Sequence, residues 1–359
     1  MDVKDYWAKE YDWDSVQSKL NNELQQFTTT VSLPSNLAFT DAIQLHFVHH
    51  TSSRQDAIPL LFIHGWPGSF LEVKNIIKHL TNPSQDTDPA FHVVAPSVPG
   101  FGFSPAPTKP GFSYVEAAHA FDSLMKQLNY PKYVIQGGDL GGLILRHQAH
   151  LYPESVISCH SNFWVVAPNS EDLERYKNND STPDERATIE VYQGFITKRW
   201  AYGQVQQTTP LRLAHGLTDS PVGLAMWIYH AMHSSVTNPS FWSLEDIITW
   251  TMMYWIQGPL GGFRYYKEAA KEGSLTLYGF GTYPFVNQPV AISEFVRDLW
   301  YRTPLDWAQR LGNVKYRVVH NTGGHFAATE TPELLAKDIR DFFGNEKLSN
   351  TGIFKSARV

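Results

Sequence analysis

The strongest constraint on this chain is a repeated pattern in which a short apolar run ends abruptly in a glycine-rich turn. The pattern occurs three times: IPLLFI runs into HGWPGS, FHVVAP into SVPGFGFS, and KYVIQ into GGDLGG. Runs that are apolar without alternation are typical of strands covered on both faces, and helical spacing follows in SYVEAAHAFDSLMKQLN. We therefore predict an α/β fold with a mostly parallel, doubly wound sheet.

The character of the sequence changes after this first sheet-forming part. A polar stretch at 168–186 leads into a region of helical spacing that is rich in aromatic residues. Strand-like runs return at 289–295 and 314–320, before an amphipathic helix at 331–343. Two sequential domains fit less well, because the last strands would then have no sheet of their own. We expect a sheet-forming core interrupted by an inserted helical cap, with the core in residues 1–166 and 286–359 and the cap in residues 167–285.

The composition favours a small-molecule ligand over a macromolecular one. The formal net charge of -6 comes without any basic run, which argues against nucleic acid and against an anionic membrane surface. No window approaches the run of about 18 apolar residues that a membrane-spanning helix needs, and the first residues do not resemble a signal peptide. The single cysteine, Cys159, cannot form an intramolecular disulfide. We expect a cytoplasmic protein.

Asp139 lies at the sharpest point of a predicted strand-to-helix turn. Gly137, Asp139 and Gly141 spell G-x-D-x-G, which is the nucleophile-elbow pattern with aspartate in place of serine. Glycines suit such a turn because side chains would crowd its tip, and the helix N-terminus favours an ionised carboxylate. An aspartate needs no base before it attacks an sp3 carbon, and the product is an alkyl ester that water must hydrolyse. The alternative is that Asp139 only caps the helix.

Two other interpretations of this turn fail on the sequence. A dinucleotide-binding loop needs glycines at i, i+2 and i+5, and neither Gly137 nor Gly138 starts such a register. A serine hydrolase would need G-x-S-x-G, which the chain lacks, and Ser69 lies on a different turn. An aspartate nucleophile is the remaining interpretation.

Hydrolysis of an ester requires a base and a group that orients it. His325 follows the last strand-like run in a glycine-rich loop, where the chain order of nucleophile, acid and histidine places the base. The acid candidates are Glu294, inside a predicted strand, Asp306, at a predicted helix start with Pro304 as the first helical residue, and Asp298, just past the strand end. We predict Asp298 as the acid and keep Glu294 in reserve.

The HGWPGS turn is a candidate for half of an oxyanion hole. The backbone N–H groups of Trp66 and Leu140 are placed to bind the oxyanion that forms when water attacks an ester. Pro67 has no N–H, and it favours a kinked or cis turn. The alternative is a tight turn in which Trp66 serves only for packing.

Nothing in the sequence indicates a metal or a cofactor. The run LHFVHH holds His46, His49 and His50, but no second group of ligands lies at a recognisable spacing. We expect these histidines to lie on the surface at the end of a strand.

With these motifs in place, the chain resembles the epoxide hydrolases of the α/β-hydrolase fold, in the branch that contains the microsomal mammalian and the soluble fungal enzymes. The likeness covers nearly the whole length and includes residues 5–31, HGWPGS, GGDLGG, DSPVGLAMWI, YYKEAA and GGHFAATETPELL. It implies an N-terminal meander ahead of the first core part. The sequence begins at this meander, without the anchor of microsomal members, which agrees with a soluble protein.

The resemblance also implies two cap tyrosines that hydrogen-bond and protonate the epoxide oxygen. The match to WAYGQVQQTTP points to Tyr202, and the match to RYYKEA points to Tyr266. Tyr265 is the neighbouring alternative, because a helix turns by about 100 degrees per residue and only one of the two can face the cleft. The chain departs from its relatives at Leu140, where many have an aromatic residue or isoleucine, and at Val296, where proline is frequent.

These observations lead us to expect cofactor-free hydrolysis of epoxides to vicinal diols through an alkyl ester of Asp139, in a detoxification role. A haloalkane dehalogenase with the same nucleophile is the first alternative, and a non-catalytic small-molecule binding protein on this fold is the second. The expected partners are a small epoxide and water, and a homodimer is left open. We expect an apolar cleft lined by cap aromatics, namely Trp242, Trp250, Trp255 and Phe263.

Overall fold

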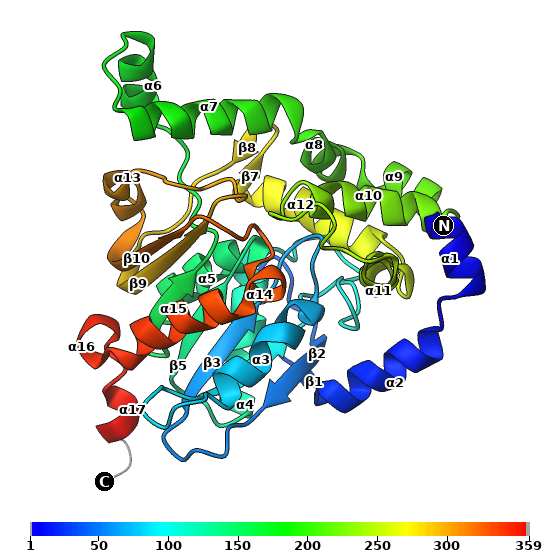
Figure 1. Ribbon diagram of the computed structural model, residues 1–359, viewed down its shortest axis with the longest axis horizontal. Helices are drawn as coiled ribbons and strands as arrows, with labels where there is room; N and C mark the ends of the chain where they lie inside the picture. The colour runs from blue at the N-terminus through cyan, green and yellow to red at the C-terminus, as the bar shows by residue number, and fades with distance from the viewer. Residues whose placement is uncertain (1, 357–359) are drawn as a thin grey trace.

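A single large sheet lies at the centre of the computed structural model, which describes residues 2–356 (Figure 1). Within these residues the strand order is β1-β2-β4-β3-β5-β6-β9-β10. The strands are β1 (Gln26–Val31), β2 (Ile43–His50), β3 (Ile58–Ile63), β4 (Phe91–Pro96), β5 (Tyr133–Gly137), β6 (Val156–Ser161), β9 (Val286–Phe295) and β10 (Gly312–His320).

The predicted fold class is confirmed. Within this sheet, as far as residues 2–356 show it, β4, β3, β5, β6, β9 and β10 pair in parallel, and only β1 with β2 and β2 with β4 pair antiparallel. The three apolar runs of the sequence become β3, β4 and β5, the central strands, and almost every residue in them is buried. Each of these strands ends where its glycine turn begins, so the turns HGWPGS and GGDLGG meet at the carboxyl edge of the sheet.

Helices cover both faces of the sheet. The chain runs outward from β3 to β4 and then returns to β5 on the other side of β3, so right-handed crossovers place α3 (Val73–Thr81) and α4 (Tyr114–Gln127) on opposite faces. Helix α3 packs against α15 (Pro332–Gly344), and α4 packs against α5 (Leu140–Leu151). Figure 1 shows α3 and α15 in front of the strands.

A helical layer connects β6 to β9 and lies along one side of the sheet in Figure 1. The division of the chain at residues 166 and 285 stays a prediction. The layer consists of α6 (Ser170–Lys177), α7 (Pro183–Lys198), α8 (Ala201–Thr208), α9 (Pro210–Thr218), α10 (Pro221–His233), α11 (Leu244–Trp255), α12 (Leu260–Glu272) and the hairpin of β7 (Leu275–Thr276) and β8 (Gly279–Phe280).

The N-terminal segment links the edge of the sheet to this helical layer. Helix α1 (Val3–Lys9) packs against α11, and α2 (Trp13–Glu23) precedes β1. The hydroxyls of Tyr11 and Thr249 lie 3.1 Å apart, which joins the loop between α1 and α2 to α11. The remaining short elements are the 3-10 helix η1 (Phe70–Glu72) and the helices α13 (Leu305–Gln309), α14 (Ala327–Glu330), α16 (Glu346–Ser349) and α17 (Ile353–Ser356).

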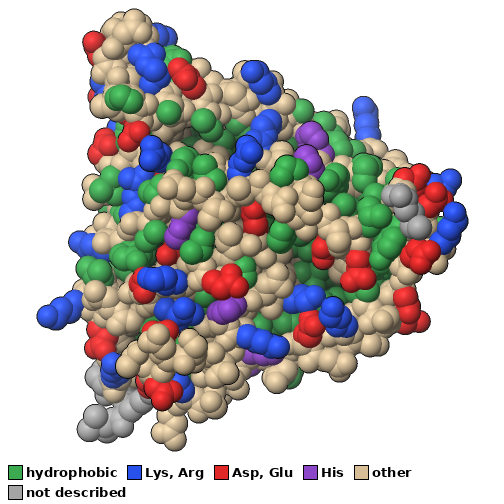
Figure 2. Space-filling view, in the orientation of Figure 1, with side chains coloured by type: hydrophobic (Ala, Val, Ile, Leu, Met, Phe, Trp, Pro, Cys, Tyr) green, Lys and Arg blue, Asp and Glu red, His purple; other side chains and the backbone are tan. Residues whose placement is uncertain are grey.

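The surface carries charges of both signs. On the face shown in Figure 2, basic and acidic side chains are interspersed with apolar ones. Among the helices of residues 2–356, none is long and apolar enough to cross a membrane.

One surface expectation is wrong. His46 lies on the inward side of β2 and is buried, because its ring packs between Phe70 and Phe103. Both ring nitrogens have partners, the hydroxyl of Ser97 at 2.9 Å and the amide oxygen of Gln26 at 2.9 Å. Burial accordingly lowers the pKa of His46 to about 4.

Candidate active site

Asp139 occupies the tip of a sharp elbow between β5 and α5. Its backbone has a φ of 48° and a ψ of -125°, and its side chain makes no capping hydrogen bond to the helix. The capping interpretation is therefore wrong, and the carboxylate is free to point into the cavity. Glycines are required by close approach, because a Cβ at Gly141 would lie 2.1 Å from the carbonyl oxygen of Ile63.

The HGWPGS turn forms a hydrogen bond with the carboxylate of Asp139. The backbone N–H of Trp66 donates to Oδ1 of Asp139 at 2.7 Å. The turn is held in place by His64, whose Nε2 accepts the backbone N–H of Val98 at 3.0 Å, and the Trp66–Pro67 peptide bond is cis. Leu140 is the first residue of α5, where backbone N–H groups have no partner within the helix.

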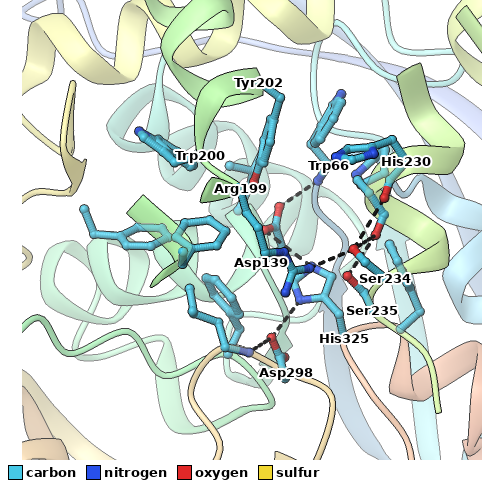
Figure 3. Close-up of a pocket in the computed structure, with 18 of the residues that line it drawn as sticks. Trp66, Asp139, Arg199, Trp200, Tyr202, His230, Ser234, Ser235, Asp298 and His325 are labelled. Atoms are coloured by element: carbon cyan, nitrogen blue, oxygen red, sulfur yellow. Dashed lines mark hydrogen bonds and ion pairs between the residues drawn. The ribbon is translucent and has the colours of Figure 1, made fainter. Parts of the chain in front are cut away.

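His325 lies between two carboxylates, as Figure 3 shows. Its Nε2 is 3.5 Å from Oδ2 of Asp139, and its Nδ1 is 3.1 Å from Oδ1 of Asp298. Burial alone would lower the pKa of His325, but attraction to Asp298 and the interactions with Asp139 raise it well above its ordinary value. The imidazole is therefore held as a cation while Asp139 is ionised.

Asp298 is the acid that contacts His325. Its Oδ1 also accepts the backbone N–H of Leu299 at 2.7 Å, which fixes the carboxylate. The reserve candidate, Glu294, is engaged elsewhere: both of its oxygens accept from the guanidinium of Arg317, at 2.8 and 2.9 Å. The geometry brings Asp298 and not Glu294 to the histidine.

Asp306 takes no part in this cluster. Its side chain is 71% exposed and its ion-pair partner is Arg310, at 3.8 Å. The helix here, α13, begins at Leu305, one residue later than predicted, because Pro304 has a ψ of 135° and serves as the N-cap.

Two tyrosines of the helical layer face this cluster. Tyr202 of α8 and Tyr266 of α12 both line the cavity, and their ring centroids are 6.2 Å apart. The indole of Trp66 stacks on Tyr202 at 4.8 Å and meets Tyr266 edge-on at 6.0 Å. Burial raises the pKa of Tyr202, as does the charge of Asp139, and burial raises that of Tyr266 well above its ordinary value. Both phenols therefore keep their protons and can donate them.

Tyr265 points away from the cavity. Its ring packs edge-on against Phe101, Phe112 and Tyr114 in the core. Its buried hydroxyl has no hydrogen-bond partner among the residues that the structure describes. Helix α12 thus directs Tyr266, and not its neighbour, toward Asp139.

The cavity above Asp139 encloses about 800 Å3, part of it open to solvent. Its apolar wall differs from the expected one. Trp242 and Trp250 pack edge-on against Phe326 beneath the cavity wall instead of lining it. The aromatic residues that line it besides Trp66 and the two tyrosines are Phe163, Phe195, Trp200, Phe280 and Phe326.

Several polar residues at the site were not anticipated from the sequence. Arg199, His230, Ser234 and Ser235 line the cavity on the side of the helical layer, and no motif marks them. Glu72, at the end of η1, lies beside the HGWPGS turn, where a Cβ at Gly68 would overlap its carboxyl group. Burial raises the pKa of Glu72 to about 8, so this carboxyl is mostly neutral at pH 7.

Comparison with known proteins identifies the family. Residues 1–73 match the family described as epoxide hydrolase N terminus, and residues 58–223 match the alpha/beta hydrolase fold. Epoxide hydrolase 1 of Sus scrofa is 32% identical over 94% of this chain and 78% of its own length. The chain belongs to the epoxide hydrolases. The resemblance stated from the motifs is thereby confirmed.

Solved epoxide hydrolases have the same architecture. The Aspergillus niger epoxide hydrolase superposes with a TM-score of 0.79 at 29% identity, over 96% of this chain and 84% of that one. The juvenile hormone epoxide hydrolase of the silkworm Bombyx mori superposes with a TM-score of 0.80 at 27% identity, over 99% of this chain and 85% of that one. This epoxide hydrolase therefore shares its fold with both a fungal and an insect enzyme. In residues 2–356 no group of three or more His, Cys, Asp or Glu side chains is placed to hold a metal ion.

Proposed function

We propose that this epoxide hydrolase converts epoxides to vicinal diols through an ester on Asp139. The observation that carries the proposal is the set of groups that surround the carboxylate of Asp139. Oδ1 of Asp139 accepts the Trp66 N–H, Oδ2 faces His325, and two tyrosines line the cavity into which it opens. The substrates are a small epoxide and water.

Ring opening uses the carboxylate oxygen that does not accept the Trp66 N–H. Oδ2 of Asp139 attacks a ring carbon, the bond from that carbon to the ring oxygen breaks, and Tyr202 or Tyr266 gives its proton to this oxygen. Oδ1 becomes the ester carbonyl oxygen and keeps the hydrogen bond from Trp66. Two donors aimed at the leaving oxygen lower the barrier, because negative charge develops there as the bond breaks.

Ester formation changes the charge around His325. While Asp139 is ionised, its charge helps to raise the pKa of His325. The ester is neutral, so this contribution disappears and the imidazole can pass its proton to the tyrosinate left by ring opening. His325 becomes a free base at the step that needs one.

Ester hydrolysis restores the resting state. His325 removes a proton from water, and the oxygen of that water attacks the ester carbonyl carbon. The resulting oxyanion on Oδ1 lies at the Trp66 N–H. Collapse breaks the acyl bond, His325 protonates the departing diol oxygen, and the acid form of Asp139 returns its proton to His325. The sum is epoxide plus water to diol.

The alternative functions gain no specific support. A dehalogenase with this nucleophile would need halide-binding donors where Tyr202 and Tyr266 lie, and these phenols suit an oxygen that accepts a proton. A binding protein would have no need of the contact between His325 and Asp298 at 3.1 Å.

The test is the variant His325→Gln. Ring opening requires no base, so brief exposure to an epoxide should leave a peptide containing Asp139 heavier by one substrate mass. Asp139→Asn should show no immediate adduct. A folded His325→Gln protein that yields neither adduct nor a burst of ring opening, with an epoxide that the parent enzyme hydrolyses, would contradict the covalent mechanism.

A further inference from the structure

Two arginines lie at the rim of the active-site cavity without a carboxylate partner. Arg199 is the residue that ends α7, and Arg297 directly precedes Asp298 in the loop after β9. Both are exposed and both line the cavity. Among residues 2–356 neither guanidinium forms an ion pair, whereas Arg54, Arg175, Arg310, Arg317 and Arg340 each do.

Arg199 belongs to the wall of the cavity that holds the catalytic cluster. In Figure 3 its side chain lies in front of Asp139 and is joined to Ser234 by a dashed line. The guanidinium donates to the hydroxyl of Ser234, the residue that ends α10, at 2.7 Å. Its positive charge acts on the side chains of the cavity, since it partly offsets the rise in the pKa of Tyr202. The hydrogen bond to Ser234 uses one terminal nitrogen of the guanidinium and leaves its other N–H groups available for a ligand.

The positive charge of the rim is local. The chain as a whole has a net charge of -6. The carboxylates of the cavity wall, Asp139 and Asp298, both have close partners in His325 and in backbone N–H groups. In Figure 2 basic and histidine side chains gather over the ends of α7 and α10. An acidic protein thus presents unpaired positive charge at the mouth of its active site.

This arrangement fits one class of epoxide. Guanidinium groups recognise carboxylates through paired, charge-assisted hydrogen bonds. The wall of the same cavity includes the apolar side chains of Phe195, Leu275 and Phe280. Without the arginines, an anionic substrate would be repelled by the nucleophile itself. A singly charged carboxylate suits the site better than a dianionic phosphate, because Asp139 and Asp298 share the same cavity.

We infer that the preferred substrate is an epoxide joined through an apolar spacer to a carboxylate, which Arg199 binds with the support of Arg297. The inference rests on the proposed function and names its substrate class. The epoxide end lies at Asp139, the spacer lies along the aromatic wall, and the carboxylate lies at the rim.

The experiment compares kcat/KM for ω-epoxyalkanoates of increasing spacer length with kcat/KM for their methyl esters. For at least one length, the parent enzyme should favour the acid by about 10-fold or more, the strength of a charge-assisted hydrogen bond. Added salt should reduce this preference, because it screens the exposed rim. Arg199→Gln should remove most of it, Arg297→Gln part of it, and Arg212→Gln, an exposed arginine outside the cavity wall, none of it.

The ratio of acid to ester separates binding of the carboxylate from a structural role. The inference is wrong if Arg199→Gln lowers kcat/KM for the acid and for the ester by the same factor. It is also wrong if the parent enzyme has equal kcat/KM for acid and ester at every spacer length. Styrene oxide tests the proposed function separately, since it has no charge. Calorimetry with cyclopropyl alkanoates, whose ring cannot open, gives the same comparison without turnover: tighter binding of the acid than of its ester supports the inference, and equal binding overturns it.

Discussion

The backbone N–H of Trp66 donates a 2.7 Å hydrogen bond to Oδ1 of Asp139, a residue 73 positions further along the chain. The two residues follow β3 and β5, which are neighbouring parallel strands, so their turns meet at one edge of the sheet. This bond assigns different tasks to the two carboxylate oxygens. One is held in what becomes the oxyanion site, and the other is left to attack.

The approach of the two turns can be broken by one methyl group. A Cβ at Gly65 would lie 2.3 Å from Oδ1 of Asp139, so Gly65→Ala must displace the carboxylate. We expect diol formation to slow by about 100-fold or more, as for loss of an oxyanion donor, with the circular dichroism spectrum unchanged. The control is Gly194→Ala in α7, where the added Cβ meets nothing within 4 Å. That variant should keep its activity and gain up to about 1 kcal/mol of stability. Full activity of Gly65→Ala would contradict the assigned geometry.

The tyrosines give a matched pair on one helix. Tyr266→Phe removes a donor to the developing alkoxide, so ring opening should slow by about 10-fold to 1,000-fold in stopped-flow single turnovers. Tyr265→Phe removes a buried hydroxyl that lacks a partner in the described structure, so activity should be kept and stability should not fall. The reverse result would mean that α12 is rotated by one residue in the active enzyme.

Substitutions of the two candidate acids should have different effects, one on catalysis and the other on stability. Asp298→Asn should slow ester hydrolysis, because Asp298 orients His325 through Nδ1, while the melting temperature changes little. Glu294→Gln breaks a buried ion pair with Arg317, so it should lower the free energy of unfolding by about 3 kcal/mol and leave kcat close to that of the parent. If Glu294→Gln lost kcat at a temperature where the variant is folded, Glu294 and not Asp298 would be the acid that orients His325.

The pKa of His325 should depend on the charge of Asp139. Attraction to Asp298 and Asp139 raises this pKa in the free enzyme, so Asp139→Asn should lower it in an NMR titration of the imidazole. The ester is neutral like asparagine, so ester hydrolysis should rise with pH through this lowered pKa and then level off, and the ester should accumulate below it. An unchanged His325 pKa in Asp139→Asn would show that the charge of Asp139 does not control the base.

The fold and the nucleophile could be predicted because their signals are local. Continuous apolar runs followed by glycine turns mark β3, β4 and β5 to within one residue. The same glycines mark the elbow. The backbone turns sharply at Asp139, and the neighbouring Gly141 lies too close to another strand's backbone for any larger residue. The order of the chain then indicated where an acid and a histidine belong.

The cavity wall could not be predicted because it depends on how the helices between β6 and β9 pack. Trp250 and Phe195 both lie at helical spacing in aromatic-rich segments, yet Trp250 is buried beneath Phe326 and Phe195 faces the cavity. Tyr265 and Tyr266 are both buried, so a hydrophobic pattern cannot distinguish them. Arg199 looks like any surface arginine at the end of a helix until α10 brings Ser234 within 2.7 Å of it.

The most direct test of the central claim follows the oxygen of water. Parent enzyme in excess over an epoxide is allowed one turnover in water enriched in oxygen-18, and the diol and the peptide containing Asp139 are analysed by mass spectrometry. Nucleophilic attack by Asp139 predicts that the first diol carries only ordinary oxygen and that the label enters the Asp139 carboxylate. Label in the first diol, with none in Asp139, would show that water opens the ring directly and that Asp139 is not the nucleophile.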